Sequence, residues 1–370
     1  MKRRQFIRGA GAAGSVVAAA AVASSFPKPA IAQSMPEVKW RLASSFPKSL
    51  DTLYGAAEFF SKRVAALTDN KFQISVFAGG QLVPPLQVLD ACQQGSVECG
   101  QTASYYYIGK DPTFAFATAL PFGLNTRQQI AWFTHGDAQK MLDEFYKEYN
   151  VRSFVCGQTG CQMGGWFRKE IKSLADMKGV KMRIGGWGGQ VMSKLGVVPQ
   201  QLAGGDIYPS LEKGTIDAAE WVGPYDDEKL GFHKVAKYFY YPGWWEGAAQ
   251  LTKFVNLPAW EKLPKMYQEA FASACWEANN WMTAKYDFEN AAALRRLLAG
   301  GAELRAYPRD VMEAAFKGAQ ELFTETAAKN PRFKKVLDSW REVRKEGYLW
   351  FQIAEYGYDS FMISQQKNFI

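Results

Sequence analysis

One arginine in a glycine-rich setting is the residue of this chain best suited to binding chemistry. Arg183 ends a short β-branched run, residues 180–184, and opens onto four glycines, Gly185, Gly186, Gly188 and Gly189. Glu220 and Trp221 end a second short run, residues 215–219. A guanidinium at the end of a strand, beside backbone that a ligand can approach closely, suits two-pronged binding of a small carboxylate. The alternative for Arg183 is an ordinary surface ion pair.

Few other residues suit catalysis. The chain has only two histidines, His135 and His233, and neither lies in a nucleophile motif, so a serine or cysteine hydrolase is not expected. A zinc or haem site is not expected either, because C-x-x-C is absent. The G-x-G-x-x-G of residues 9–14 follows no predicted strand, so it does not indicate a dinucleotide site. We therefore expect no enzyme and no organic cofactor.

The first 32 residues are predicted to be an export signal that is removed. Basic residues lie at positions 2, 3, 4 and 8, residues 9–23 are mildly apolar, and residues 30–32 fit a small-x-small cleavage site. Arg3 and Arg4, followed by Gln-Phe-Ile-Arg, resemble a twin-arginine signal. The apolar run is shorter than the roughly 20 residues that a membrane span requires. We expect a periplasmic protein that is exported by the twin-arginine route.

Five cysteines follow the signal, Cys92, Cys99, Cys156, Cys161 and Cys275. An odd number cannot form a closed disulfide framework. The periplasm is oxidising enough for a Cys156–Cys161 bridge, but a twin-arginine substrate first folds in the reducing cytoplasm. We therefore expect buried free thiols.

The net charge indicates which partners to expect, and the chain length indicates how many domains. The signal carries five basic and no acidic residues, so its removal lowers the net charge from +8 to +3. The chain has no Lys/Arg stripe interleaved with aromatic residues, so nucleic acid is not an expected partner. About 338 residues, with 48% hydrophobic residues in the whole chain, are long for one domain. We expect two lobes.

Alternating strand and helix patterns predict an α/β fold. In the first part, strands are expected over residues 38–43, 72–77, 97–103 and 151–155. Helices are expected over residues 50–67, 86–92 and 126–149, the last capped by Thr126. Further strands are expected over residues 180–184, 215–219, 237–241 and 248–255. We predict lobe I from residues 33–155 plus about 247–288 and lobe II from residues 156–246 plus about 289–330, joined by hinge strands.

The C-terminal part is predicted to be helical. Residues 264–298 read as one very long helix, with Pro264 in its first turn, and residues 304–307 and 310–328 read as a strand and a helix. Residues 331–370 are expected to form a final helix. Its large apolar side chains share one face, Phe333, Val336, Leu337, Trp340, Val343, Phe351, Ala354 and Tyr358. Such a face packs on the chain's own core or forms a dimer contact.

Four segments carry a resemblance to a known family, FAGGQLVPPLQVLDACQQGSVECG, ALPFG, IKSLADMKGVKMRIGG and LEKGTIDAAEWVGPYDD. With the leader and the long helix, they resemble the extracytoplasmic solute-binding proteins of tripartite ATP-independent periplasmic (TRAP) transporters over residues 36–368. EWVGPYDD and GWWEG are similar to the alpha-keto-acid-binding branch and its lactate-binding relatives. The resemblance implies a two-lobed periplasmic binding protein fold, type II-like, with hinge strands, a long connecting helix and an extra C-terminal helix.

The resemblance also implies a binding site. In that branch the arginine that matches Arg183 holds the ligand carboxylate, and a tyrosine that matches Tyr106, with the register uncertain by one within residues 105–107, contacts the ligand. A cation bridges ligand and protein through residues that match Gln158, Glu220, Trp221 (by its backbone carbonyl) and Glu246. Gln158, Glu220 and Trp221 are expected at the ligand as well.

These residue types suit the chemistry that the resemblance implies. A 2-oxo or 2-hydroxy acid offers a carboxylate and an adjacent oxygen that can chelate a hard cation, and carboxylate and amide oxygens complete its shell. We favour sodium over calcium. The alternative for Glu220 and Glu246 is two unrelated surface acids. Core packing is the alternative to cavity walls for four tryptophans, Trp187, Trp221, Trp244 and Trp245.

The resemblance implies a protein that captures a small, pyruvate-like 2-oxo or 2-hydroxy monocarboxylate by closure of its lobes and delivers it to a TRAP membrane permease. A homodimer through the C-terminal helix is also implied, because some keto-acid members exchange that helix. Two alternatives stay open, an exported cofactor-bearing enzyme and a ligand sensor that presents its closed form to a receptor.

Overall fold

The computed structural model describes residues 35–366, so the export signal predicted for residues 1–32 lies outside the described residues. Within them, the strands form two mixed sheets. The first sheet has the order β2-β1-β3-β10-β4. Its strands are β1 (Val38–Ser44), β2 (Phe72–Phe77), β3 (Cys99–Thr102), β4 (Val151–Gln158) and β10 (Gln250–Asn256). β1 runs parallel to β2 and β3, and β10 runs antiparallel to β3 and β4.

The second sheet has the order β11-β9-β5-β8-β6-β7. Its strands are β5 (Trp166–Phe167), β6 (Lys181–Arg183), β7 (Val198–Gln200), β8 (Ala218–Ala219), β9 (Tyr238–Tyr241) and β11 (Glu303–Ala306). β6 lies between β7 and β8 and is parallel to both. Two mixed sheets with helices confirm the α/β class. The lobe boundaries that we proposed remain a prediction.

Helices flank the strands of the first sheet. The α-helices are α2 (Leu53–Leu67), α3 (Val88–Gln93), α4 (Thr126–Thr134), α5 (Ala138–Lys147) and α9 (Leu257–Glu261), and the 3₁₀ helices are η1 (Pro85–Gln87), η2 (Ser104–Tyr107) and η3 (Pro112–Ala117). The single helix predicted over residues 126–149 was wrong, because the chain breaks after His135 at Gly136, a poor helix former. Its cap is Asn125, which shares a capping box with Gln128, and not Thr126.

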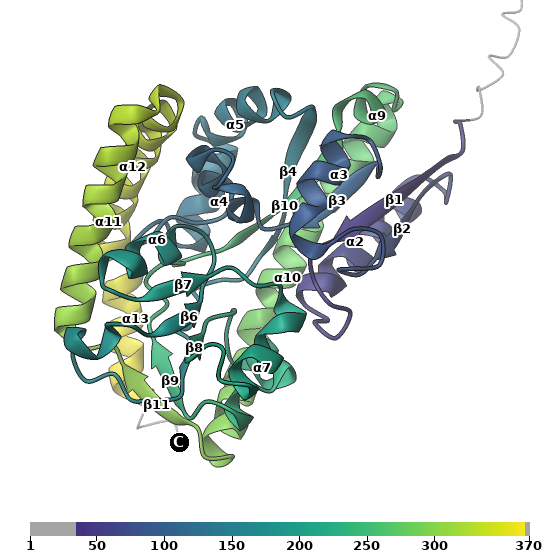
Figure 1. Cartoon of the computed structure of the whole chain (residues 1–370). Helices are drawn as coiled ribbons and strands as arrows, with labels where there is room; N and C mark the ends of the chain where they lie inside the picture. Colours follow the sequence, from purple (N-terminus) through teal and green to yellow (C-terminus); the bar gives the residue numbers. More distant parts are fainter. Residues whose placement is uncertain (1–34, 367–370) are drawn as a thin grey trace, which may run out of the picture. The chain divides into compact units, whose positions relative to one another are not determined.

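The helices around the second sheet are α6 (Gly186–Lys194), α7 (Gly204–Glu212), α8 (Pro224–Leu230), α11 (Arg309–Lys329), η4 (Leu174–Met177) and η5 (Phe232–Lys234). The first sheet with its flanking helices is called the first-sheet part below, and the second sheet with its helices the second-sheet part. One long helix, α10 (Lys265–Ala299), contacts β4 and α2 of the first-sheet part and α8 of the second-sheet part. Figure 1 shows it passing alongside strands of both sheets. The long helix that we predicted is confirmed, with Pro264 just before its first residue.

Two helices end the described chain, α12 (Pro331–Ile353) and α13 (Glu355–Gln365), where one was predicted. α12 packs beside α11 (Figure 1). The first part of the apolar face is core, because Phe333, Val336, Leu337 and Trp340 are buried. In the second part, Val343, Phe351 and Ala354 are half-buried and Tyr358 is exposed, and α13 has no buried residue.

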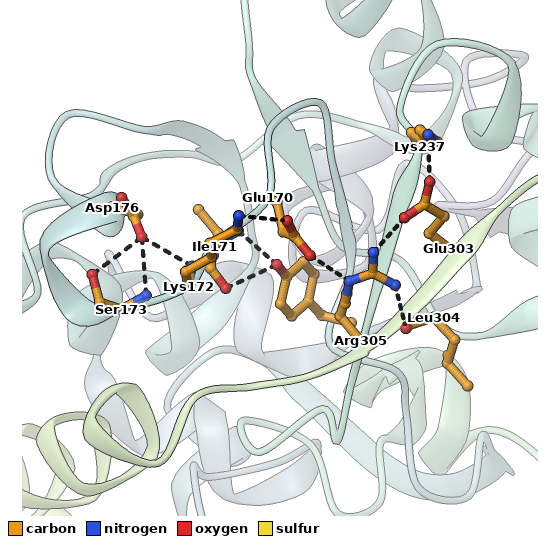
Figure 2. Close-up of polar contacts among 10 residues, drawn as sticks. Glu170, Ile171, Lys172, Ser173, Asp176, Lys237, Glu303, Leu304 and Arg305 are labelled. Carbon is orange, nitrogen blue, oxygen red and sulfur yellow. Dashed lines mark hydrogen bonds and ion pairs between the residues drawn. The ribbon is translucent and has the colours of Figure 1, made fainter.

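A surface network fastens the loop after β5 to the edge of the second sheet (Figure 2). Arg305 of β11 donates to Glu170 at 2.5 Å and also pairs with Glu303, which in turn pairs with Lys237. The Tyr240 hydroxyl, on β9, accepts from the backbone N–H of Ile171 at 2.6 Å and donates to its carbonyl at 3.0 Å. Exposed ion pairs contribute little stability each, so the buried Tyr240 contacts are the stronger part of this attachment.

All five cysteines lie within the described residues and carry free thiols. Four are buried as predicted, but Cys161 is exposed, so the expectation of burial was wrong there. In the part of the chain that the structure describes, no helix has the length and the hydropathy that crossing a membrane requires.

Candidate functional site

Arg183 lies at the end of β6, in the interior of the second sheet, and its side chain is 1% exposed. Its Nη1 atom forms an ion pair with Glu220 Oε1 and donates to the Glu220 carbonyl at 2.8 Å. Its Nε atom donates to the carbonyl of Leu202 at 3.1 Å. The surface ion pair that was the alternative for Arg183 is therefore excluded.

Glu220 follows β8 directly, beside Arg183 on the neighbouring strand. Its Oε1 atom accepts the N–H of Gly185 at 3.0 Å, whereas its buried Oε2 atom has no hydrogen-bond partner among the described residues. Burial raises the pKa of Glu220, although the charge of Arg183 and the Gly185 bond act against that rise. Glu220 therefore carries one free oxygen in a dry environment.

The guanidinium of Arg183 does not offer the two-pronged contact that we expected. Both N–H bonds of Nη1 are taken by Glu220, and the single N–H of Nε is taken by Leu202. The Nη2 atom is buried and has no partner within the described residues. A ligand therefore has one nitrogen of this guanidinium to bind, because the fold uses the rest to position it.

Glu246, in the turn between β9 and β10, is buried as well. Its Oε2 atom has no hydrogen-bond partner in the described part of the chain. Burial, and next the negative charge of Glu220, raise the pKa of Glu246 well above its usual range. Neither glutamate is a surface acid, so that alternative is excluded. Two carboxyl groups instead share a water-poor site with one arginine.

The tyrosines of η2 face the site from the first-sheet part. Tyr105 and Tyr106 both line the cavity described below, whereas Tyr107 is hydrogen-bonded to the backbone N–H of Leu89 inside the first-sheet core. Burial raises the pKa of Tyr106 to about 12, despite the opposing charge of Arg183. The ligand contact from Tyr106 remains a prediction, and Tyr105 lines the same cavity.

Tyr105 packs against the glycines that follow Arg183. A Cβ atom on Gly186, where φ is +59°, would lie 1.8 Å from Tyr105 Cδ2, and one on Gly185 would lie 2.7 Å from Tyr105 Cε2. These two positions therefore require glycine for the close approach of a ring from the other sheet's elements. The sequence pattern indicated a close approach here, but not that a tyrosine makes it.

A small cavity of about 20 Å³ lies between elements of the two sheets. The second-sheet part contributes Arg183, Trp221 and Val222, and the first-sheet part contributes Tyr105 and Tyr106. The remaining wall is formed by Phe46, Leu53, Ala103, Thr118, Thr159, Gln162, Ala249 and Leu251. A mostly apolar hollow with a few convergent polar groups is typical of small-molecule sites.

Only one of the four tryptophans lines this cavity. The Trp221 ring lies 4.9 Å from the carbon of the Arg183 guanidinium, a cation–π distance. Trp187 stacks on Phe333, and Trp244 stacks on Phe122. Trp245 meets both Trp244 and the distant Tyr307 edge to face. For these three residues the alternative of core packing holds, because aromatic neighbours from distant segments cover them.

Gln158, at the end of β4, is not joined by a hydrogen bond to Arg183, Glu220 or Glu246 in the described residues. Its Oε1 atom accepts the N–H groups of Thr159 and Gly160 at 2.9 and 3.3 Å. Gln162, which we did not predict, lines the cavity, and its buried Oε1 atom has no partner in the described chain. The signal that could have found it is the second glutamine in the run GQTGCQ.

The predicted cation ligands can be tested against this geometry. Within residues 35–366, no three or more His, Cys, Asp or Glu side chains form a metal-binding group. The predicted cation ligands include only two carboxylates, and an amide oxygen and a backbone carbonyl oxygen complete the coordination shell of the cation. The unpartnered Glu220 Oε2 and Glu246 Oε2 atoms fit an oxygen-liganded cation, because each is a buried acceptor without a donor.

Comparison with known proteins identifies the family. The profile of the bacterial extracellular solute-binding proteins of family 7 matches residues 43–330. The chain belongs to this family. The family 7 protein described here is also 51% identical, over 366 residues, to the monocarboxylate 2-oxoacid-binding periplasmic protein of Nostoc sp., covering 99% of this chain and 100% of the relative.

Two solved structures are also similar. A TRAP transporter solute-binding protein from Bordetella bronchiseptica, a mixed-occupancy dimer with copurified calcium and picolinate, is 53% identical, with a TM-score of 0.90 over 90% of this chain and 100% of that one. A TRAP periplasmic solute-binding protein from Pseudoalteromonas atlantica, with bound sodium and pyruvate, is 36% identical, with a TM-score of 0.85 over 88% of this chain and 99% of that one. The predicted TRAP binding protein and its two-lobed fold are confirmed. These relatives are named as solute-binding proteins.

Proposed function

We propose that this family 7 protein captures a small 2-oxo or 2-hydroxy monocarboxylate, such as pyruvate, together with a bridging cation. The observation that carries the proposal is the set of three buried polar atoms without partners in the described chain, Arg183 Nη2, Glu220 Oε2 and Glu246 Oε2. Each costs free energy while it is unpaired, so a ligand that pairs all three is favoured. The 2-oxoacid named for the Nostoc relative and the pyruvate in the Pseudoalteromonas structure support this class of ligand.

The chain's own residues divide the work between the acid and the cation. In this proposal Arg183 Nη2 donates to one carboxylate oxygen, and the hydroxyl of Tyr106, which lines the same cavity, donates to the other. Trp221 holds the guanidinium plane and closes the wall. Glu220, Glu246 and the Trp221 carbonyl would hold the cation. Gln158 would join them only by releasing the N–H groups of Thr159 and Gly160 that its amide oxygen accepts. A cation held by Glu220 and Glu246 would offset their charge and that of the acid.

Charge balance favours a divalent ion over the sodium that we first named. Arg183 contributes one positive charge, while Glu220, Glu246 and the ligand carboxylate contribute three negative charges when all are ionised. A divalent cation makes the buried set neutral, and a monovalent one leaves it negative, which is costly in a dry site. The calcium in the Bordetella structure agrees with this count, and the sodium in the Pseudoalteromonas structure keeps the monovalent ion as the competitor to test.

We infer that the protein delivers its bound acid to a membrane transport system. The cavity receives residues from both sheets, so closure of the lobes buries the acid, and only the liganded, closed form presents both lobes to a membrane permease in one arrangement. Such a protein is not an enzyme and needs no organic cofactor. It works in the periplasm after twin-arginine export.

A homodimer is part of the proposal. The apolar side chains of α12 and α13 that contact nothing in the core include Trp350 (59% exposed), Ile353 (67%) and Phe361 (62%). Neighbouring exposed apolar side chains are a common sign of a contact with another protein. The same face of a second copy can cover these side chains, as happens in other twofold dimers, where one patch of each subunit meets its counterpart. The dimer in the Bordetella structure supports a paired state.

A thermal-shift titration tests the function. Metal-stripped protein is titrated with pyruvate, 2-oxobutyrate, lactate and succinate, each with and without calcium or sodium. A ligand that binds the native state raises the melting temperature by mass action. The proposal predicts a rise with a monocarboxylate that requires a cation. A rise with succinate alone, or with no acid under any cation, contradicts it.

A further inference from the structure

Two adjacent aspartates at the start of α8 have different partners. Asp226 is fully buried, and both of its oxygens accept hydrogen bonds from other elements, Oδ1 from the Thr52 hydroxyl at 2.6 Å and Oδ2 from the Tyr286 hydroxyl at 2.6 Å. Thr52 precedes α2, which packs with the first sheet, and Tyr286 lies on α10. The Asp226 carboxyl group, in the second-sheet part, therefore binds both the start of α2 and the long helix α10, which pack with the first sheet. This pair of hydrogen bonds is called the clasp below.

Thr52 does not cap its own helix and instead makes this contact. It stands at the N-cap position of α2, where a threonine hydroxyl normally accepts a backbone N–H of the first turn. Here the side chain makes no capping bond and instead donates to Asp226, 174 residues away in the sequence. The first turn of α2 thus loses a stabilising bond, and the two sheet parts gain one.

Asp227 holds α8 in place within its own part. Its Oδ2 atom accepts from Trp166 Nε1 at 2.9 Å, and its Oδ1 atom accepts from the N–H groups of Val222 and Gly223 at 3.3 and 3.2 Å. These bonds tie the first turn of α8 to β5 and to the segment that follows Trp221. A displacement of α8 is therefore a displacement of the cavity wall.

The clasp lies close to the cavity on both sides. Leu53, the residue after Thr52, lines the cavity, and so do Trp221 and Val222, which stand just before the turn into α8. Around the clasp, exposed Asp51 pairs with Lys285 at 2.8 Å, pairs with Lys229, and accepts from the Tyr225 hydroxyl. Exposed ion pairs are weak, so the buried Thr52–Asp226–Tyr286 bonds carry most of the contact energy.

We propose that the Thr52–Asp226–Tyr286 clasp is a positioning device that forms as the two lobes close and so contributes to ligand affinity without touching the ligand. The inference rests on the proposed function. A hydrogen bond present only in the closed form shifts the open–closed equilibrium, and the apparent affinity changes by the same factor. Asp226 sets the position of the lobes, and Asp227 transmits that position to Trp221.

The test compares two threonines at opposite ends of α2. Thr52→Val removes the clasp hydroxyl, and Thr52→Ser keeps it. Thr68→Val is the matched control, because the buried Thr68 hydroxyl bonds only within the first-sheet part, to the Val64 carbonyl at 2.7 Å and from the Phe72 N–H at 3.2 Å. Pyruvate affinity is measured with saturating calcium, and unfolding is measured without ligand.

We expect Thr52→Val to weaken pyruvate binding roughly tenfold, the factor that corresponds to about 1.4 kcal/mol, through faster dissociation. Thr52→Ser restores the affinity. Thr68→Val lowers the melting temperature and leaves the affinity within roughly twofold, because its lost bond is present in both forms. Equal affinities of Thr52→Val and wild type, with a lowered melting temperature, would overturn the proposal and make the clasp a permanent part of the hinge.

A measurement without ligand separates this inference from the proposed function. Spin labels at exposed Ser75 of β2 and exposed Lys213 after α7, in a Cys161→Ser background, report the distance between the two parts. Thr52→Val should shift the unliganded population toward longer distances, and Thr68→Val should not. If wild type binds no acid but this shift appears, the proposed function fails and the clasp stands. If the two valine variants give the same distances as wild type, the clasp proposal fails.

Discussion

Arg183 and Glu220 form an ion pair in which each side chain is only 1% exposed. The pair joins the ends of β6 and β8, and it leaves one guanidinium nitrogen and one carboxylate oxygen without partners among the described residues. Breaking a buried ion pair leaves an uncompensated charge, which is far costlier than losing a surface pair. The pair thus stabilises the fold and also positions the two free polar atoms of the proposed binding site.

Replacement of Arg183 by alanine should abolish pyruvate binding and also destabilise the fold. Glu220 loses its countercharge while it stays buried, so we expect the free energy of unfolding to fall by about 3–5 kcal/mol, measured by urea denaturation. The burial of the pair, which the sequence did not indicate, is the reason for this loss of stability. Adding Glu220→Gln should recover part of the stability and none of the binding. Wild-type affinity in Arg183→Ala would refute the site.

Replacement of Glu246 by glutamine should have opposite effects on stability and on binding. Burial and the neighbouring charge of Glu220 raise the pKa of Glu246, so the neutral amide should stabilise the ligand-free protein. Cation-dependent binding should be lost, since one oxygen ligand loses its charge. Thermal unfolding and calorimetric titration measure the two effects. Glu277→Gln, in a surface pair with Arg63, is the control that should change neither. Normal calcium-dependent binding by Glu246→Gln would remove it from the cation site.

Stability should fall as pH rises because of Asp227. Burial raises the pKa of Asp227 to about 8, so the folded state keeps a proton that the unfolded chain releases near its ordinary pKa. Between roughly pH 4 and pH 8 the unfolded state binds fewer protons, so stability declines by up to about 1.4 kcal/mol per pH unit from this group and levels off above pH 8.

Denaturation of wild type and Asp227→Asn between pH 5 and pH 7.5 measures this slope. The asparagine cannot titrate, so its curve should be flatter than that of wild type. Asp176→Asn is the control, since hydrogen bonds from Lys172 and Ser173 lower the pKa of Asp176 and place its effect below this interval. Parallel wild-type and Asp227→Asn curves would mean that Asp227 is ionised in the folded state at pH 5.

The exposed apolar face of α12 and α13 should hold two copies together. Trp350→Glu with Ile353→Glu places charges in that face without touching the buried part of α12 at Phe333 and Trp340. Light scattering coupled to gel filtration should give a dimer for wild type and a folded monomer for the double variant. A monomeric wild type at micromolar concentration would contradict the proposed dimer.

The elements that the sequence predicted well are those with local signals. The strict alternation of β2 predicted Phe72–Phe77 with its bounds, because buried Phe72 and Ile74 flank exposed Gln73. The long helix α10 also followed from local pattern, with proline before it and glycine after it. The helix predicted over residues 126–149 failed because the amphipathic pattern continues across Gly136, where the backbone does not.

The site was predicted in its acids and its arginine but not in its contacts. The family resemblance led to Arg183, Glu220 and Glu246, which the structure buries near one cavity. The engagement of Nη1 by Glu220 and the packing of Tyr105 on Gly186 depend on strands and lobes that are distant in sequence, so no local pattern indicates them. Gln162 escaped notice although it stands only four residues after Gln158, in the run GQTGCQ.

Calorimetric titration of metal-stripped wild-type protein with pyruvate, with and without calcium, tests the central claim most directly. The proposed site predicts one pyruvate bound per chain when calcium is present and no measurable heat after exhaustive chelation in sodium-free buffer, because Arg183 alone then faces the three negative charges of the acid, Glu220 and Glu246. Pyruvate binding of equal strength in both titrations would contradict the bridging cation. The absence of binding in both would contradict the assignment of a small 2-oxo acid to this cavity.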